Sequence, residues 1–217
     1  MSDSLLSEIK KLHKEEKDSI AKRLLEFVHV FEKGTAERLF GELSFCLLTP
    51  QSKAKNCWRA IENLTKKGLL LKGTPDEISK EIKGFARFHN NKAKYIVEAR
   101  TLLSKNGKID VKSKIKEFKD IKELREWLVK NIKGMGYKEA GHFLRNIGFG
   151  KEITILDRHI LRNLKALGVI KELPKTITTK SYLEIEKKMI AFAKKIGIPL
   201  DHLDIVFWRK ETGEIFK

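Results

Sequence analysis

The sequence is poor in cysteine, and neither cysteine lies in a metal-binding pattern. It contains two, Cys46 and Cys57. The absence of a CxxC pair or a Cys/His cluster argues against a structural zinc or iron–sulfur site, and we expect neither a metal nor a cofactor. Both cysteines have apolar neighbours at helical spacing. We therefore expect buried thiols in a protein of the reducing cytoplasm.

Long apolar runs are also missing, and proline and glycine are scarce. No stretch approaches the length of a membrane span, and the charged segment 1–17 lacks the apolar core of a signal peptide. We expect no membrane association. With 4 prolines and 14 glycines among 217 residues, long helices are favoured over a turn-rich β fold.

Acidic residues are outnumbered by basic ones. The chain has 46 Lys and Arg against 29 Asp and Glu, a net charge of +17, and the excess is spread over both halves. Such a surface concentrates phosphate polyanions. A thermophilic surface rich in lysine and glutamate is the alternative, but ion-pair networks need matched charges. The charge therefore favours nucleic-acid binding.

Apolar residues recur with the helical period through most of the chain, which predicts an all-α protein. Gly34 ends the first helix, Thr35 caps the next, and Thr74–Glu77 resembles a helix start. Residues 168–180 form the main irregular connector. The expected helices cover 5–28, 39–48, a segment starting at Pro50 or Gln51, a segment starting near Pro75, 90–106 closed by Asn106-Gly107, and 121–131.

A Gly-x-Gly hairpin between two helices is the most informative local pattern. The segment reads Ile132-Lys133-Gly134-Met135-Gly136-Tyr137-Lys138-Glu139-Ala140. Glycines permit positive φ and a close approach of the backbone to a ligand. Amides at the start of the second helix form an anion site, and in a basic protein the anion is plausibly a DNA phosphate. An ordinary turn between two helices is the alternative.

This hairpin resembles that of the helix-hairpin-helix-GPD superfamily of DNA glycosylases. In its bifunctional members a lysine stands two positions after the second glycine, where Lys138 stands. A catalytic aspartate follows the next helix, and Asp157 in Ile155-Leu156-Asp157-Arg158-His159-Ile160 fits that place. The Gly/Pro-rich loop of the superfamily is represented only by Gly148 and Gly150, without proline.

Three further segments resemble the compact archaeal-type 8-oxoguanine DNA glycosylase/AP lyases. They are Leu47–Ser52, Ala86–Ala93 and the tail that contains Phe207–Lys210 and ends in Phe216-Lys217. The resemblance covers most of the chain. It implies two helical lobes around a DNA-binding cleft, with no cofactor, acting as a monomer on double-stranded DNA that contains a damaged base.

The resemblance implies that Lys138 attacks C1′ of a flipped nucleotide, forms a Schiff base and permits β-elimination. Most lysines are solvated charges, so the hairpin and the aspartate single this one out. Asp157 would remain ionised and stabilise the oxocarbenium-like state. It also suits the N-cap of the following helix, and both roles can hold together.

The base pocket implied by the resemblance consists of Phe88, Trp208 and Lys217. The two aromatic rings would sandwich the base and the C-terminal lysine would read it. Gln51 would fill the gap left in the duplex. The alternatives are a core position for Phe88, a packing anchor for Trp208, a frayed terminus for Lys217 and a helix cap for Gln51.

The remaining polar residues divide into phosphate contacts and structural residues. Gly134, Gly136 and Lys133 are expected at a DNA phosphate. Arg158 and Arg162 contact phosphate or lie on a solvated helix face. Without a partner at ligand spacing, the histidines are expected to be structural or surface residues, namely His142, His159 and His202.

We expect one lobe over residues 31–125 and a second over 1–30 with 126–217. The predicted function is excision of 8-oxoguanine followed by strand cleavage at the abasic site, in a cytoplasmic, nucleoid-associated protein. One alternative is a glycosylase/lyase for other oxidised bases or abasic sites. Others are a non-catalytic helix-hairpin-helix module and an RNA-binding protein.

Overall fold

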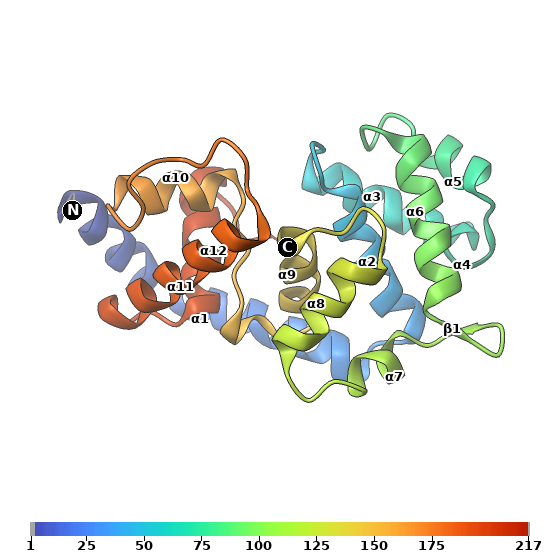
Figure 1. The fold of residues 1–217 in the computed structure, drawn as a ribbon, viewed down its shortest axis with the longest axis horizontal. Helices are drawn as coiled ribbons and strands as arrows, with labels where there is room; N and C mark the ends of the chain where they lie inside the picture. Colours follow the sequence, from blue (N-terminus) through green and yellow to red (C-terminus); the bar gives the residue numbers. More distant parts are fainter. Residues whose placement is uncertain (1–2, 217) are drawn as a thin grey trace. The chain divides into compact units, whose positions relative to one another are not determined.

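The computed structural model describes residues 3–216, and the regular secondary structure in that range is almost entirely helical (Figure 1). The predicted all-α class is confirmed there. None of its helices is long and apolar enough to cross a membrane. The order of elements is α1 (Asp3–Lys33), α2 (Ala36–Leu48), α3 (Ala54–Lys66), α4 (Leu69–Lys72), α5 (Pro75–Ile82), α6 (His89–Leu102), β1 (Ser104–Lys105), β2 (Lys108–Ile109), α7 (Val111–Lys116), α8 (Ile121–Asn131), α9 (Tyr137–Asn146), η1 (Gly150–Glu152), α10 (Arg158–Ala166), α11 (Thr179–Ile196) and α12 (Leu200–Thr212).

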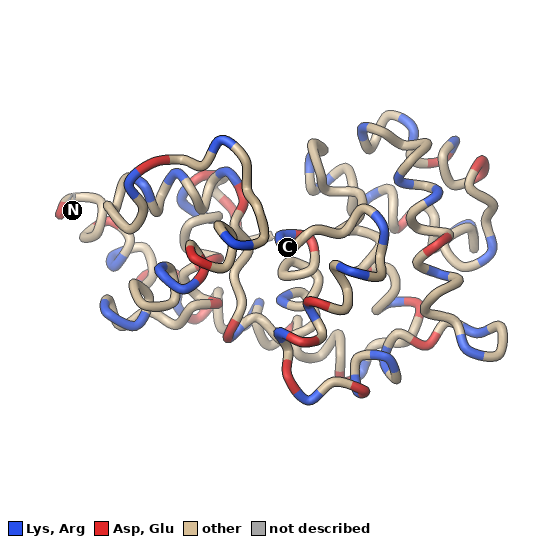
Figure 2. The backbone as a smooth tube through the Cα atoms, viewed as in Figure 1, with Lys and Arg blue, Asp and Glu red and all other residues tan. Residues whose placement is uncertain are grey.

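The chain divides into two compact units. The hairpin unit is His29–Phe143, and the terminal unit combines Met1–Val28 with Leu144–Lys217. Helices α1 and α9 contribute residues to both units. Lysine and arginine are spread along the backbone of each unit (Figure 2), in agreement with a domain that is basic throughout.

The boundary before the second lobe differs from the expected one. The sequence placed it after residue 125, whereas the hairpin unit includes α8 and the Gly-x-Gly hairpin. Contact with α6 explains this grouping. A Cβ at Gly134 would lie 2.3 Å from Cδ2 of Tyr95. The Lys133 ammonium lies 5.8 Å from the centre of the same ring.

Helix α2 forms the core of the hairpin unit. Every residue from Leu39 to Leu48 is buried, and the helix packs against α3, α6, α7 and β2. An apolar surface around the whole helix suits this central position. The buried carboxylate of Glu42 is paired with Nη2 of Arg38 at 2.8 Å, which offsets the cost of removing the charge from water.

Local capping signals predicted several helix starts correctly. The Thr35 hydroxyl accepts a hydrogen bond from the Arg38 amide at 3.1 Å. Thr74 and Glu77 form a reciprocal capping box at the start of α5. Helix α8 has the bounds expected for residues 121–131. These predictions are confirmed. The two capping interactions join residues three positions apart, so the local sequence was enough to predict the helix starts.

The predicted continuation of a helix to residue 106 is wrong. Helix α6 ends at Leu102, and a short antiparallel hairpin follows in which Ser104 pairs with Ile109. Asn106 and Gly107 have φ angles of 51° and 73°. Positive φ at both central residues is the geometry of a two-residue hairpin turn, which Asn-Gly favours.

The helix expected to begin at Pro50 or Gln51 begins later. Gln51 has a φ of 55°, which a right-handed helix excludes. Lys53 is the N-cap and Ala54 the first helical residue of α3. The segment between α2 and α3 is therefore a turn rather than a helix start.

In the terminal unit, α11 holds the segment that leads to α10. The Tyr182 hydroxyl donates to the Thr154 carbonyl at 2.7 Å and accepts from the Leu156 amide at 3.2 Å. The Glu186 carboxylate accepts from the Thr154 amide at 2.9 Å. These buried bonds fix the backbone immediately before Asp157.

Both cysteines are free and buried, as predicted. Burial raises the pKa of the Cys57 thiol to about 11. The thiol is therefore protonated at neutral pH and is a poor nucleophile. It donates a hydrogen bond to the Leu48 carbonyl at 3.2 Å, which makes it part of the packing between α3 and the end of α2.

Candidate active site

The hairpin places one glycine where no other residue fits. Gly134 has a φ of +81°, and the Tyr95 ring occupies the space of a Cβ. Gly136 differs from the expectation because its φ is not positive. It lies before α9, and its amide donates to Oε2 of Glu139 at 3.3 Å. The first glycine is therefore required by its positive φ and by the Tyr95 ring, whereas a Cβ at the second would meet only the flexible end of the Glu139 side chain, at 3.1 Å.

Lys133 carries the exposed charge of the hairpin. Its side chain is 65% exposed and forms a 3.6 Å ion pair with Glu98. An ion pair this exposed contributes little to stability and can exchange its carboxylate for a phosphate. Lys133, Gly134 and Gly136 lie on one turn of the hairpin unit, and a phosphate contact there stays a prediction.

Lys138 lies in the first turn of α9 and is not a solvated surface lysine. Its side chain is 25% exposed. The ammonium donates to the Thr49 hydroxyl at 3.3 Å and lies 3.7 Å from Oε1 of Glu139. Thr49 is the C-cap of α2. The contact joins the hairpin to the Leu47–Ser52 segment, 89 residues earlier in the chain.

Lys92 is a site residue that the sequence analysis missed. It is 4% exposed, on α6. Its ammonium donates to the carbonyls of Leu48 and Pro50, each at 2.7 Å, and to the Ser52 hydroxyl at 3.1 Å. Burial lowers the pKa of Lys92, and the nearby charge of Lys138 acts in the same direction. The residue stood inside the quoted Ala86–Ala93 segment, but nothing local distinguished it from the other lysines.

Gln51 and Phe88 share an unusual backbone conformation in the hairpin unit. Their φ angles are 55° and 57°, in the left-handed region that favours glycine. Both side chains are exposed, and Phe88 is 55% exposed. A core position for Phe88 and a capping role for Gln51 in α3 are therefore wrong. Strained backbone conformations cluster at ligand-binding sites, so these two exposed residues are candidates for contact with a ligand.

Asp157 is the N-cap of α10 in the terminal unit. Its Oδ1 accepts from the amides of His159 and Ile160, at 2.8 and 2.9 Å. The predicted cap is confirmed. The carboxylate is fixed by two hydrogen bonds and lies at the positive end of the helix dipole.

Trp208 lies on α12 and packs edge-on against a histidine. The centres of the Trp208 and His159 rings are 5.7 Å apart. The buried indole N–H finds no hydrogen-bond acceptor among residues 3–216. The Glu211 carboxylate lies 3.5 Å from Nδ1 of His159 and accepts from Asn163 at 2.9 Å. His159 is thus a structural residue that supports the face of α12 carrying Trp208. Lys217 lies outside the described residues.

The carboxylate below Trp208 is held in its ionised form. Burial acts to raise the pKa of Glu211, but the hydrogen bond from Asn163 and the charge of Lys210 outweigh it, and the pKa is lowered. An ionised Glu211 accepts more strongly from its partners.

The other polar residues are structural or exposed. His142 is buried against the ring of Phe45, with centroids 5.4 Å apart. His202 lies 3.2 Å from His13 across two helices of the terminal unit. Arg158 and Arg162 are exposed on α10. Within residues 3–216, no group of three His, Cys, Asp or Glu side chains is placed to hold a metal ion.

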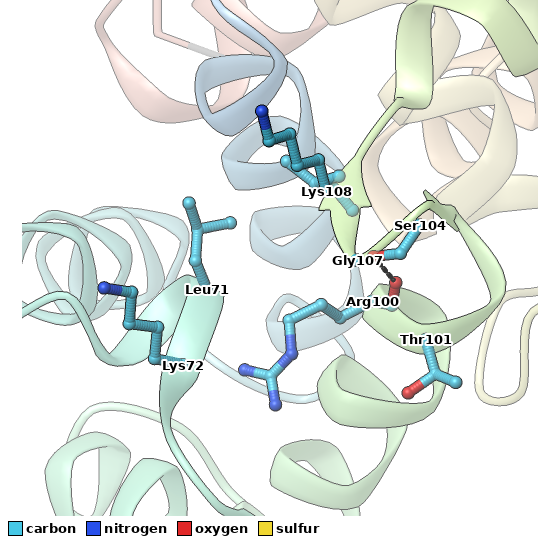
Figure 3. A pocket seen from close by; sticks show the side chains of 8 residues that line it. Leu71, Lys72, Arg100, Thr101, Ser104, Gly107 and Lys108 are labelled. Carbon is cyan, nitrogen blue, oxygen red and sulfur yellow. Dashed lines mark hydrogen bonds between the residues drawn. The ribbon is translucent and has the colours of Figure 1, made fainter.

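A basic cavity of about 460 Å³ lies elsewhere in the hairpin unit (Figure 3). Lys72, Lys108 and Arg100 line it, and none of its lining residues is a predicted site residue. The Arg100 guanidinium donates to the carbonyls of Leu70 and Gly73, at 3.2 and 2.8 Å. Figure 3 shows the side chains of Lys72 and Lys108 extending from different elements, with their amino groups separated from one another. Arg100 therefore serves to join α6 to α4.

The predicted site residues thus fall into two groups. The hairpin unit carries Lys138, Gln51, Phe88 and the hairpin glycines with Lys133. The terminal unit carries Asp157 and Trp208. In the first group, the Lys92 ammonium is bonded to the backbone next to Gln51. In the second group, the amides at the α10 N-terminus hold the Asp157 carboxylate, and the His159 ring packs against Trp208.

Comparison with known proteins gives matches over nearly the whole chain. The family model Ogg-HhH, described as 8-oxoguanine DNA glycosylase, matches residues 20–198. An 8-oxoguanine DNA glycosylase/AP lyase of Fusobacterium nucleatum is 53% identical over 211 residues, which are 97% of each chain. The crystal structure of the 8-oxoguanine DNA glycosylase of Thermotoga maritima is similar with a TM-score of 0.89 and 35% identity, over 100% of both chains.

A second solved structure contains nucleic acid. It is the 8-oxoguanine glycosylase/lyase of Methanocaldococcus jannaschii in complex with a 15mer DNA containing 8-oxoguanine. Its TM-score is 0.88 at 36% identity, and the match covers 99% of this chain and 100% of that chain.

Proposed function

The chain belongs to the Ogg-HhH family of 8-oxoguanine DNA glycosylases, and we propose that it excises 8-oxoguanine from double-stranded DNA and cleaves the strand at the resulting abasic site. The observation that carries this proposal is the placement of Lys138. It lies in the first turn after the hairpin, partly buried, with its ammonium held by Thr49.

The proposed reaction begins at C1′ of a nucleotide extruded from the duplex. Lys138 loses a proton, and the Nζ lone pair attacks C1′. The bond from C1′ to the base breaks, and the base departs with that electron pair and takes up a proton. Opening of the sugar ring then gives a protonated Schiff base between Nζ and C1′.

Strand cleavage follows from the Schiff base. The iminium acidifies C2′, so a proton leaves C2′ and the electrons form a double bond to C3′. The bond from C3′ to the phosphate oxygen breaks, and the 3′ phosphate departs as the 5′ end of the downstream strand. Hydrolysis of the imine with one water molecule releases Lys138 as the free amine. No oxidant, reductant or metal is needed for this balance.

Asp157 has the charge required at the developing oxocarbenium ion. Two amides fix its Oδ1 at the α10 N-terminus, so the carboxylate is oriented before substrate binds. Preoriented charge stabilises a transition state more effectively than a mobile group. We assign Asp157 this electrostatic role, with helix capping as the means by which it is held.

Recognition of the substrate is assigned to the exposed and aromatic residues. The rings of Phe88 and Trp208 would enclose the base, Lys217 would read its edge, and Gln51 would enter the vacated position in the duplex. The exposure of Phe88 supports this assignment because more than half of the side chain is open to solvent and can stack on a base. The hairpin glycines and Lys133 would hold a backbone phosphate.

The partner proposed is duplex DNA with a damaged base, bound by a monomer. The enzyme would work where chromosomal DNA is, in the cytoplasm of a prokaryotic cell. The net charge of +17 supports electrostatic attraction to the duplex, which weakens as salt rises. Light scattering of the free protein and of its complex with a 15-base-pair duplex would measure the stoichiometry, and we expect one protein molecule per duplex.

Borohydride trapping tests the proposed chemistry directly. Wild-type protein on a duplex with one 8-oxoguanine should give a covalent adduct after reduction of the Schiff base. Lys138→Gln should lose the adduct and reduce excision by roughly 1,000-fold or more, because the nucleophile is gone. Its DNA affinity and unfolding temperature should change little. Lys94→Gln, which changes an exposed lysine of the same unit, is the matched control and should trap like wild type.

The same assay distinguishes the alternatives. An adduct with an abasic site but not with 8-oxoguanine would retain the lyase and reject the substrate. No adduct with either duplex would reject the enzyme and favour a non-catalytic helix-hairpin-helix module. Stronger binding to an A-form RNA duplex than to B-form DNA would favour the RNA-binding alternative.

A further inference from the structure

The Ser52 hydroxyl joins the two segments of the hairpin unit that contain the left-handed residues Gln51 and Phe88. The Ser52 Oγ accepts from the Arg87 amide at 2.9 Å and donates to the Pro50 carbonyl at 3.3 Å. Ser52 directly follows Gln51, and Arg87 directly precedes Phe88. The two left-handed residues are thus each one position from the same hydrogen bond.

Lys92 also forms hydrogen bonds with both segments. Its ammonium donates to the Pro50 carbonyl and to the Ser52 hydroxyl, the residues on either side of Gln51. Its own amide donates to the Phe88 carbonyl at 3.1 Å, in the first turn of α6. Lys92 is therefore bonded to the carbonyl that precedes Gln51 and to the carbonyl of Phe88 itself.

The third donor of Lys92 reaches the end of α2. It is bonded to the Leu48 carbonyl at 2.7 Å, next to Thr49, which accepts from Lys138. Terminal helix carbonyls are a favourable site for a cation because the helix dipole is negative there. The same ammonium thus holds the Pro50–Ser52 loop against the end of α2, one residue from the Thr49 hydroxyl that accepts from the proposed nucleophile.

A purely structural role does not account for these features. Among residues 3–216 the Lys92 ammonium donates only to neutral oxygens, those of Leu48, Pro50 and Ser52. Burial lowers the pKa of Lys92, and the nearby charge of Glu139 offsets this only in part, so burying the cation here opposes folding. Strained backbone persists only where its surroundings impose it. Both unfavourable features occur at the same two loops.

The geometry points to Lys92 and Ser52 as positioning residues that hold Gln51 and Phe88 at a fixed spacing, so that one can enter the duplex while the other stacks on the extruded base. This inference rests on the proposed function and adds two residues to it. Neither residue touches the reacting atoms, and both act through the loops that they join. We refer to the pair as the loop clamp.

The loop clamp predicts a selective defect. In Ser52→Ala the Arg87 amide and the Lys92 ammonium lose a shared acceptor, and the two loops can separate. Extrusion and stacking of the base should suffer. An abasic site offers no base to stack, so its cleavage by Lys138 should suffer less. We expect single-turnover excision of 8-oxoguanine to fall about 30-fold and abasic-site cleavage to fall less than about threefold, in line with the loss of the hydrogen bonds that Ser52 accepts from Arg87 and Lys92.

Controls separate positioning from folding. Ser104→Ala removes a hydroxyl that donates to the Arg100 carbonyl in the same unit and should leave both rates unchanged. Ser52→Thr retains the hydroxyl and should recover most of the excision rate. A fluorescent purine analogue beside the lesion should report slower base extrusion in Ser52→Ala, a signal that a loss of stability alone would not change below the unfolding temperature.

Lys92→Met is the second variant, with similar length and no donors. It should show the same selectivity with a larger loss of excision. If it does not fold, Ser52→Ala still decides the matter. Equal losses on the two substrates, or no loss in Ser52→Ala, would overturn the loop clamp while wild-type excision upheld the proposed function. A wild type that cleaves abasic sites but not 8-oxoguanine would reject the function itself and the clamp with it.

Discussion

The hairpin unit and the terminal unit support their site residues by different means. In the hairpin unit, Gln51 lies between α2 and α3 and Phe88 is the N-cap of α6, both with a left-handed backbone held by hydrogen bonds from distant segments. In the terminal unit, Asp157 is the N-cap of α10 with an ordinary extended backbone, and Trp208 lies on α12 beside His159. The first arrangement includes a strained backbone, whereas the second requires only regular cap and helix geometry.

This difference suggests a division of work. Loops can enter a duplex or stack on a base because their backbone is not committed to a helix. A helix end is rigid and carries its own positive potential, which suits a carboxylate that must stay ionised. The proposed recognition residues Gln51 and Phe88 follow the first pattern, and the proposed electrostatic residue Asp157 follows the second.

The largest effect should come from separating the two roles of Asp157. Asn is as good an N-cap as Asp, so Asp157→Asn should fold with nearly wild-type stability while excision falls on the order of 100-fold or more, because the negative charge is lost. Asp157→Ala should show a similar loss of excision and, in addition, lose about 1 kcal/mol of unfolding free energy. Urea unfolding and single-turnover excision measure the two effects. If Asp157→Asn excised 8-oxoguanine at the wild-type rate, Asp157 would act only as a helix cap.

A smaller effect is expected at the hairpin, where a backbone constraint replaces a charge. Gly134→Ala places a methyl group where the Tyr95 ring lies and imposes a positive φ on a non-glycine residue. We expect a loss of about 1–3 kcal/mol in unfolding free energy, together with weaker binding of undamaged DNA. Gly84→Ala is the matched control, since its φ of +85° adds the same backbone strain with no atom within 4 Å of the new Cβ. An equal loss of unfolding free energy in both variants would show that the contact with the Tyr95 ring adds nothing to the cost of positive φ.

The smallest effect concerns the packing of α1 on α12 in the terminal unit. His13 Nε2 and His202 Nδ1 are 3.2 Å apart, so one ring must accept from the other. Burial lowers the pKa of both rings from 6.5, and the charge of Lys17 acts in the same direction, whereas Asp201 opposes it at His202. Between the folded pKa values and 6.5 the unfolded chain binds more protons, so stability should fall as the pH falls through that window.

Thermal unfolding from pH 7.5 to 5 measures this dependence. We expect a loss under about 1 kcal/mol, since both rings are partly solvated. His13→Asn should flatten the dependence, and His89→Asn, on a helix of the hairpin unit, should not. An unchanged slope in the His13 variant would assign the pH dependence to other groups.

Sequence patterns predicted the parts of the site that depend on neighbouring residues. The cap at Asp157, the helix start at Thr74 and the bounds of α8 each depend on hydrogen bonds or periodicity within a few residues. The hairpin at Gly134 was predicted for the same reason. Resemblance to known glycosylases then supplied the roles of Lys138 and Asp157, which local chemistry alone left as one lysine among many and one good helix cap.

Only the tertiary structure decided the rest, because it depends on contacts between distant segments. Asn106-Gly107 can end a helix or turn a hairpin, and the pairing of Ser104 with Ile109 selects the hairpin. Lys92 became a buried support because its acceptors at Leu48 and Pro50 lie 44 and 42 residues earlier in the chain. A side chain's burial and partners are properties of the packed chain, so no pattern within one helix could have distinguished that lysine from its solvated neighbours.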